Sequence, residues 1–185
     1  MKSQGQPRLN VCAVLRHADG STETFLGKNT VTNDGDIYYA KKGAGDSVAS
    51  NENFETPACV LQNPSSQNSL TKADAYQQVT SPLAASGEIQ GTTESAYPKA
   101  NDTGNSENGG ALVDAVTYKF AWTTAQINTS SGQPIRGGCI FDVAVTSPTT
   151  GTKILTHWNF DDPAYFHKTD TDTLTLYVNH RMNGT

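Results

Sequence analysis

A regular alternation of apolar and polar residues in the C-terminal half constrains the fold more than any other feature of the sequence. Val116, Tyr118, Phe120 and Trp122 occupy every second position of one run. Because successive side chains of a β-strand point to opposite faces, a period of two predicts a strand with one buried face. Three later runs have the same period: 141–145, 154–160 and 174–182.

The N-terminal half begins with the signals of a β-hairpin. An apolar-rich run at 9–15 is followed by the turn dipeptide Asp19-Gly20 and then by a second run at 22–26. Two such runs on either side of an Asp-Gly signal predict two antiparallel strands joined by a tight turn.

Further turn signals divide the rest of this half. We interpret 33–36, Asn-Asp-Gly-Asp, as a turn that leads into the run 37–40. Pro57 interrupts the run 54–61 and predicts an edge strand or a bulge, because proline cannot donate to a strand ladder. No stretch combines helical spacing with caps, although 70–79 is suited to a short helix.

Many short strands separated by turns are typical of two packed antiparallel sheets. We therefore predict an all-β fold, an antiparallel β-sandwich of jelly-roll-like form with a long irregular arm. The predicted core consists of inward-facing residues of the alternating strands: Val116, Tyr118, Phe120, Trp122, Phe141, Val143, Val145, Trp158, Leu174, Leu176 and Val178.

The predicted arm is the segment 62–110, in which 27 of 49 residues are Ser, Thr, Asn, Gln or Gly. A segment so poor in large apolar residues cannot offset its own ordering cost, and loops of this length are usually functional or disordered. We predict one β-sandwich domain made of residues 1–61 and 111–185, with 62–110 inserted as an extended arm that lies on a partner.

Composition excludes several classes of function. The formal charge of −5, from 13 Lys and Arg against 18 Asp and Glu, gives no basic field to hold nucleic acid. No apolar run approaches the roughly 20 residues that span a bilayer, and the first seven residues lack the apolar core of a secretory signal. We expect no nucleic-acid partner, no membrane partner and synthesis in a cytoplasm.

No set of residues marks a catalytic site. Cys12, Cys59 and Cys139 are odd in number and far apart, which predicts buried, reduced thiols. The chain has four histidines, His17, His157, His167 and His180. A catalytic histidine needs an orienting carboxylate and a nucleophile, and no motif supplies them for any of the four. His180 alternates with apolar residues and is expected in the core or at an interface. We expect no enzyme activity, no catalytic residue and no cofactor.

The acidic clusters have structural explanations. Asp161-Asp162-Pro163 is a turn signature at the end of a strand, and 169–172 is a polar loop before the final strand, so a pair of acid and base carboxylates is disfavoured. The alternate oxygens of 170–172 or 33–36 resemble calcium-ligand spacing but lack the glycine and distal Glu of an EF-hand loop. We predict no metal.

Aromatic residues leave one alternative open. The candidates for a sugar-binding platform are Tyr38-Tyr39, Trp122, Trp158 and Tyr165-Phe166. Alternation assigns both tryptophans to the core. Tyr165 and Phe166 follow Pro163 in a loop, so they are the better candidates for an exposed contact with another subunit or with a saccharide.

Two parts of the chain resemble the virion proteins of tailed bacteriophages. They are the closing third, with WNFDDP at 158–163, HKTDTDTLTL at 167–176 and NGT at 183–185, and the segment NTVTNDGDIYYA at 29–40. Such proteins are often small β-sandwich or jelly-roll subunits that decorate or cement an icosahedral head, or that sit at the neck and tail. The motifs that carry the resemblance are turns and strands, so the resemblance assigns no functional residue to this chain.

The resemblance implies a non-enzymatic capsid cement or decoration protein that binds the outside of a phage head and stabilises the shell. Its expected partners are the major capsid protein or other virion subunits, and a homo-oligomer, with a trimer favoured, would add avidity. The expected location is the virion, after synthesis in the host cytoplasm. The alternatives are a tail or neck component, or a carbohydrate-binding receptor-recognition module of a phage tail.

Overall fold

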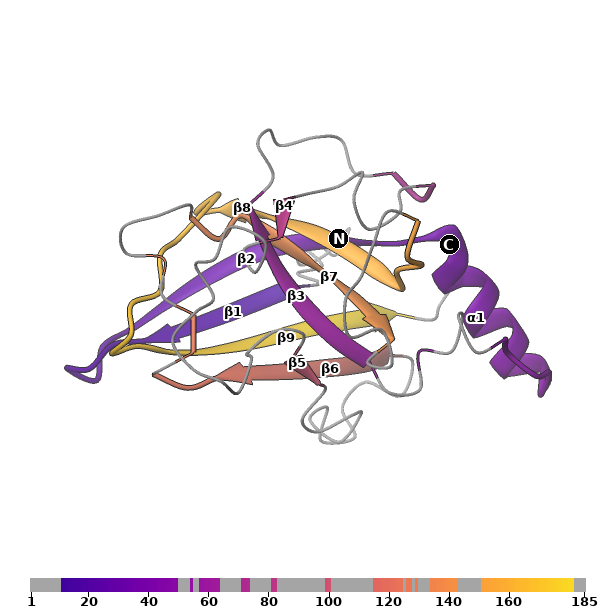
Figure 1. Ribbon diagram of the computed structural model, residues 1–185, viewed down its shortest axis with the longest axis horizontal. Helices are drawn as coiled ribbons and strands as arrows, with labels where there is room; N and C mark the ends of the chain where they lie inside the picture. Colours follow the sequence, from indigo (N-terminus) through magenta and orange to yellow (C-terminus); the bar gives the residue numbers. More distant parts are fainter. Residues whose placement is uncertain are drawn as a thin grey trace, which may run out of the picture.

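The computed structural model describes the following residues: 11–49, 54, 57–63, 71–73, 81–82, 99–100, 115–124, 126–127, 129, 134–142 and 151–181. In these parts the chain forms nine strands and one helix (Figure 1). In chain order they are β1 (Val11–Arg16), β2 (Thr22–Val31), α1 (Asn33–Ala44), β3 (Pro57–Asn63), β4 (Ser81–Pro82), β5 (Lys99–Ala100), β6 (Ala115–Trp122), β7 (Gly137–Asp142), β8 (Thr156–Asp162) and β9 (Thr173–Arg181).

The strands form one continuous sheet in the order β4-β3-β7-β8-β2-β1-β9-β6, and β5 pairs with β3. Every strand pairing is antiparallel. The sheet curls until β5, at one end, contacts β6 at the other, so it nearly closes. Figure 1 shows β3 passing in front of β1 and β9. The all-β antiparallel class is therefore confirmed, whereas a jelly-roll connectivity is not established by this strand order.

The two ends of the curled sheet enclose the apolar core. Leu15 on β1, Phe120 on β6, Trp158 on β8 and Leu176 on β9 are all buried in one hydrophobic cluster. Burial of each such side chain contributes about 1.5–3 kcal/mol, so the alternating strands supply most of the driving force. The structure buries eight of the predicted core residues: Tyr118, Phe120, Trp122, Phe141, Trp158, Leu174, Leu176 and Val178. Val143, Val145 and the Val116 side chain lie outside the described residues.

The β1–β2 hairpin is confirmed. Its strands pair from Val11 opposite Gly27 to Arg16 opposite Thr22. The turn uses Gly20 at φ 86°, a conformation that glycine adopts without steric cost.

The sequence predicts an edge strand or a bulge at Pro57, but the strand that contains Pro57 has paired neighbours on both of its sides. Pro57 is the first residue of β3, which pairs with β7 along one side and with the two-residue strands β4 and β5 along the other. The first position suits proline because it has no N–H to place in the ladder.

Helix α1 corrects the interpretation of 33–40 as a turn and a following run. Thr32 caps the helix by accepting from the Gly35 amide at 3.0 Å, and Gly45 ends it in the left-handed conformation at φ 77°. Asp34 and Asp36 lie in the first turn and Lys41 and Lys42 in the last, which matches the helix dipole. Only Gly35 and Tyr38 are buried, so the helix has no continuous apolar stripe.

Parts of the predicted arm are described, and they lie on the domain. β4 and β5 both pair with β3, and the carbonyl of Lys72 accepts from the Asn33 amide at 2.8 Å. Residues 71–73 are irregular, and the rest of the predicted short helix at 70–79 lies outside the described residues. The domain boundaries at 61 and 111 stay a prediction.

Candidate functional site

The loop between β8 and β9 brings the polar residues of the C-terminal third together with the β1–β2 turn. From Tyr165 to Lys168, exposed and buried residues alternate along this loop, as they do where successive side chains point to opposite sides. Phe166 and Lys168 are buried, whereas Tyr165 and His167 are exposed. One side of the loop therefore packs on the domain and the other is free to contact a ligand or partner.

Phe166 anchors this loop. Its ring stacks on Phe25 with centroids 4.1 Å apart, and its backbone exchanges two hydrogen bonds with Ile135, at 2.8 and 3.1 Å. The expectation that Phe166 forms an exposed contact is therefore wrong: its ring fills a gap in the core. Tyr165 is 49% exposed, as the sequence predicts.

Arg136 and His167 flank the exposed Tyr165 ring. The Arg136 guanidinium lies over the ring, with its Cζ atom 4.7 Å from the centroid, and His167 meets the ring at 6.2 Å and 83°. Hydrogen bonds of 2.9 Å from the Arg136 amide to Gln62, and from the Phe160 amide to Arg136, fix the backbone beneath. We call Arg136, Tyr165 and His167 the Tyr165 surface.

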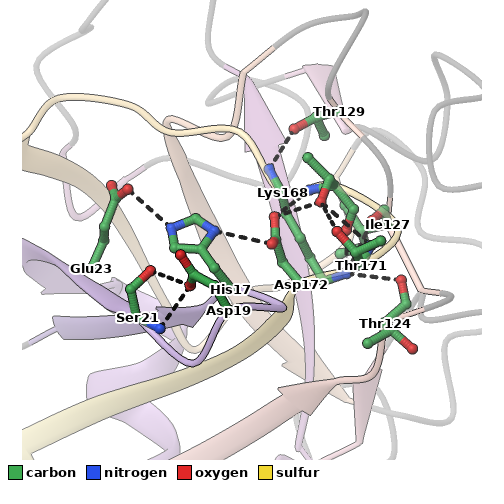
Figure 2. Close-up of polar contacts among 11 residues, drawn as sticks. His17, Asp19, Ser21, Glu23, Thr124, Ile127, Thr129, Lys168, Thr171 and Asp172 are labelled. Atoms are coloured by element: carbon green, nitrogen blue, oxygen red, sulfur yellow. Dashed lines mark hydrogen bonds and ion pairs between the residues drawn. The ribbon is translucent and has the colours of Figure 1, made fainter.

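Lys168 is a buried lysine whose ammonium is fully used by backbone carbonyls. Its Nζ atom donates to Thr124 at 3.2 Å, Ile127 at 3.2 Å and Thr169 at 3.0 Å (Figure 2). Burial lowers the pKa of Lys168 to about 8, although the negative charge of Asp172 acts in the opposite direction. At neutral pH the group is still mostly protonated, so it ties loops together as a cation.

The loop that Lys168 holds contains a strained residue. Ile127 has φ 60°, which is an outlier for a β-branched side chain, and it is 1% exposed. Nearby, the Thr129 amide donates to the Lys168 carbonyl at 2.8 Å, and His167 Nδ1 donates to the Thr129 carbonyl at 2.6 Å. These bonds at Thr129, and the bond from Lys168 Nζ to the Ile127 carbonyl, hold the segment in which this conformation occurs.

His17 bridges two carboxylates at the same end of the sheet, as Figure 2 shows. Its Nδ1 atom lies 3.0 Å from Asp172 Oδ1 and its Nε2 atom lies 3.0 Å from Glu23 Oε1. The hydrogen bond with Asp172 and then that with Glu23 raise the pKa of His17. Burial acts to raise the pKa of Asp172, but hydrogen bonds from Thr169 and His17 outweigh it, and the pKa is lowered.

This arrangement does not resemble a catalytic triad. Both ring nitrogens of His17 face carboxylates, so the ring has no nitrogen free to take a proton from a nucleophile. The Ser21 hydroxyl in the same turn donates instead to Asp19, at 2.6 Å. The cluster joins chain segments by charge, which is a structural role.

A second buried polar cluster lies between α1 and the sheet. The hydroxyl of Tyr39, on α1, is 2.5 Å from His180 Nδ1 on β9 and 3.1 Å from the Tyr118 hydroxyl on β6. Burial lowers the pKa of His180 to about 3 and raises that of Tyr118 to about 12. His180 is 2% exposed, so the expected core position is confirmed.

The other candidates from the sequence are dispersed. His157 is buried, and its Nε2 atom bonds the Thr71 carbonyl at 2.9 Å. Cys59 and Cys139 are buried free thiols, and burial raises the pKa of both, which disfavours reactive thiolates. Cys12 is only partly buried. Sequence reasoning missed Lys168 and Arg136, because in the sequence both resemble ordinary surface cations.

Within the described ranges, no three or more His, Cys, Asp or Glu side chains gather in a way that could hold a metal ion. The described helix is too short and too polar to cross a membrane. Comparisons of the chain with protein-family models, with curated proteins and with solved structures find nothing similar.

Proposed function

We propose that this chain is a non-enzymatic structural protein of a tailed-bacteriophage particle, a cement or decoration protein that binds the outside of the head through the Tyr165 surface. The observation that carries the proposal is the Tyr165 ring, which is 49% exposed although the next residue, Phe166, is buried in the domain. The virion class itself comes from the resemblance of segments 29–40 and 158–185.

The Tyr165 surface has the properties of an interaction hot spot. Tyrosine and arginine are enriched among residues that dominate binding energy. Ordering a flexible side chain on binding costs about 0.5–1.5 kcal/mol, and the stacking of Arg136 on Tyr165 has already restricted both side chains. Phe166 and the Ile135 backbone hold the loop in place, so the surface is preformed.

The buried polar clusters support a structural rather than a catalytic role. The three donors of Lys168 are all directed at backbone carbonyls, and His17 is held between Asp172 and Glu23. Such networks fix loops relative to the sheet and make the shape of the surface constant, which is what a bridging subunit needs.

A cement protein acts by mass action. Each copy that binds the assembled shell, and not its dissociated subunits, shifts the equilibrium towards the shell. A symmetric oligomer, for which we favour a trimer, turns several weak Tyr165 contacts into avidity.

Carbohydrate recognition by a tail protein is the second candidate, and the Tyr165 surface favours it too. An exposed aromatic ring offers an apolar face for a sugar ring, and polar groups beside it can bond the sugar hydroxyl groups. His167 donates through Nδ1 to Thr129, which leaves Nε2 for a hydroxyl group.

Binding of purified protein to capsids assembled without it tests the proposal. Truncation of a hot-spot residue costs about 2 kcal/mol or more, so Tyr165→Ala should weaken binding by roughly 30-fold. Ile37→Ala is the matched control, because Ile37 is also a large exposed apolar residue, 45% exposed, on α1. Equal binding by both variants would refute the assignment of the surface. If the native protein bound glycans but not capsids, and Tyr165→Ala no longer bound glycans, the second candidate would be favoured.

A further inference from the structure

We propose that His17 is a proton-dependent clamp, which in its charged form fastens the β1–β2 turn to the loop before β9. The inference rests on the position of the imidazole between Asp172 and Glu23, with a 3.0 Å contact from each ring nitrogen. It is independent of the proposed function, because it concerns only contacts within the chain.

The geometry favours a doubly protonated ring. Ionised carboxylates only accept hydrogen bonds, and a neutral imidazole carries a single N–H. In the neutral ring one nitrogen lone pair would face a carboxylate oxygen at 3.0 Å, which is repulsive. Both contacts are favourable together only in the imidazolium form.

The clamp joins segments that are distant in sequence. His17 follows β1 directly, Glu23 lies on β2, and Asp172 precedes β9. β1 is the central strand of these three, since Arg16 pairs with Thr22 on one side and with Thr173 on the other. His17 therefore closes the open end of the β2–β1–β9 unit.

Asp172 extends the effect into the loop. Its Oδ2 atom accepts from the Thr169 amide at 2.8 Å and from the Thr169 hydroxyl at 2.7 Å. The Thr169 carbonyl in turn accepts from Lys168 Nζ. Hydrogen bonds therefore connect His17, through Asp172 and Thr169, to the loop that carries Tyr165.

The charges around the ring favour its protonated form. Glu23 from β2, Asp19 from the turn and Asp172 from the loop are negative, and Asp19 interacts electrostatically with His17. Two cations belong to the same elements: the Lys168 ammonium is directed at backbone carbonyls, and Arg16 on β1 has an exposed side chain. Asp170, which lies in the same loop as Asp172, is exposed.

The direction of the pH dependence follows from these contacts. The pKa of His17 is raised in the folded chain by its bonds to Asp172 and then Glu23. As long as both carboxylates are ionised, the clamp is complete below about pH 6.5, the ordinary value for histidine, and it is lost as pH rises through the folded-state pKa.

A nuclear magnetic resonance titration of the full chain tests the clamp. We expect the His17 ring to titrate above the ordinary histidine value and to carry protons on both nitrogens at pH 6. Glu23→Gln should move its pKa down, because the neutral amide no longer favours the cation. Asp46→Asn is the control with the same change in charge, since Asp46 is exposed beyond the far end of α1.

Hydrogen exchange at the Thr169 amide gives a second readout. Its protection, corrected for the intrinsic pH effect, should fall in the native chain as His17 loses its proton and stay constant in His17→Gln. An ordinary or lowered His17 pKa would overturn the proposal, and so would equal effects of Glu23→Gln and Asp46→Asn. Because the titration uses the native chain, it decides the question even where His17→Gln fails to fold.

Discussion

Acid should destabilise this protein through His180, and the structure gives the size of the effect. His180 is 2% exposed, and burial lowers its folded-state pKa to about 3. In the unfolded chain a histidine titrates near 6.5, so the unfolded state takes up a proton that the folded state excludes. Stability is therefore present above pH 6.5 and is lost as pH falls towards 3. Between pH 7 and 4.5 the loss from this one group is about 2–3 kcal/mol.

The comparison variant is His180→Phe, which keeps an aromatic ring and removes the titration. The Tyr39 hydroxyl keeps its contact with Tyr118 in this variant, and the unpaired His180 Nε2 atom is removed. Urea unfolding at several pH values, followed by the fluorescence of the buried Trp122 and Trp158, measures both proteins. Groups common to the two proteins cancel in the difference of their free energies of unfolding. A difference that stays constant from pH 7 to 4.5 would refute the reasoning.

Two further changes test the packing that holds the site. Lys168→Met should lower the free energy of unfolding by about 1–3 kcal/mol in urea titrations, because three carbonyls, including that of the strained Ile127, lose their buried donor. Gly138→Ala should destabilise by about 1–3 kcal/mol and alter the near-ultraviolet circular dichroism, since its Cβ would meet the Trp158 ring at 2.5 Å. Gly43→Ala, with nothing within 4 Å, should stabilise α1 by up to about 1 kcal/mol and serves as its control.

The strands were predictable because burial of one face leaves a period of two in the sequence. Tyr118, Phe120 and Trp122 show that period and are buried together on β6. The helix was not predictable from apolar spacing, because α1 buries only Gly35 and Tyr38. Its caps and end charges were present in the sequence, and they outweighed the turn signal of the Asp-Gly pair.

The candidate site was less accessible to sequence reasoning. The period of a strand assigns faces but not the register between strands, and His17 and Asp172 are 155 residues apart. Nothing local distinguishes Lys168 from a surface lysine, since its carbonyl partners come from the backbone of another loop. The sequence predicts that Tyr165 and Phe166 are both exposed. In the structure Phe166 is buried because it stacks on Phe25, whereas Tyr165 is exposed.

The central claim is that this chain is a bridging subunit of a phage head. Quantitative mass spectrometry of purified particles, with the major capsid protein as the internal standard, measures it most directly. The proposal predicts hundreds of copies per particle, and Tyr165→Ala should lower that number sharply whereas Ile37→Ala should not. A handful of copies per particle, or none, would contradict a role in cementing the head.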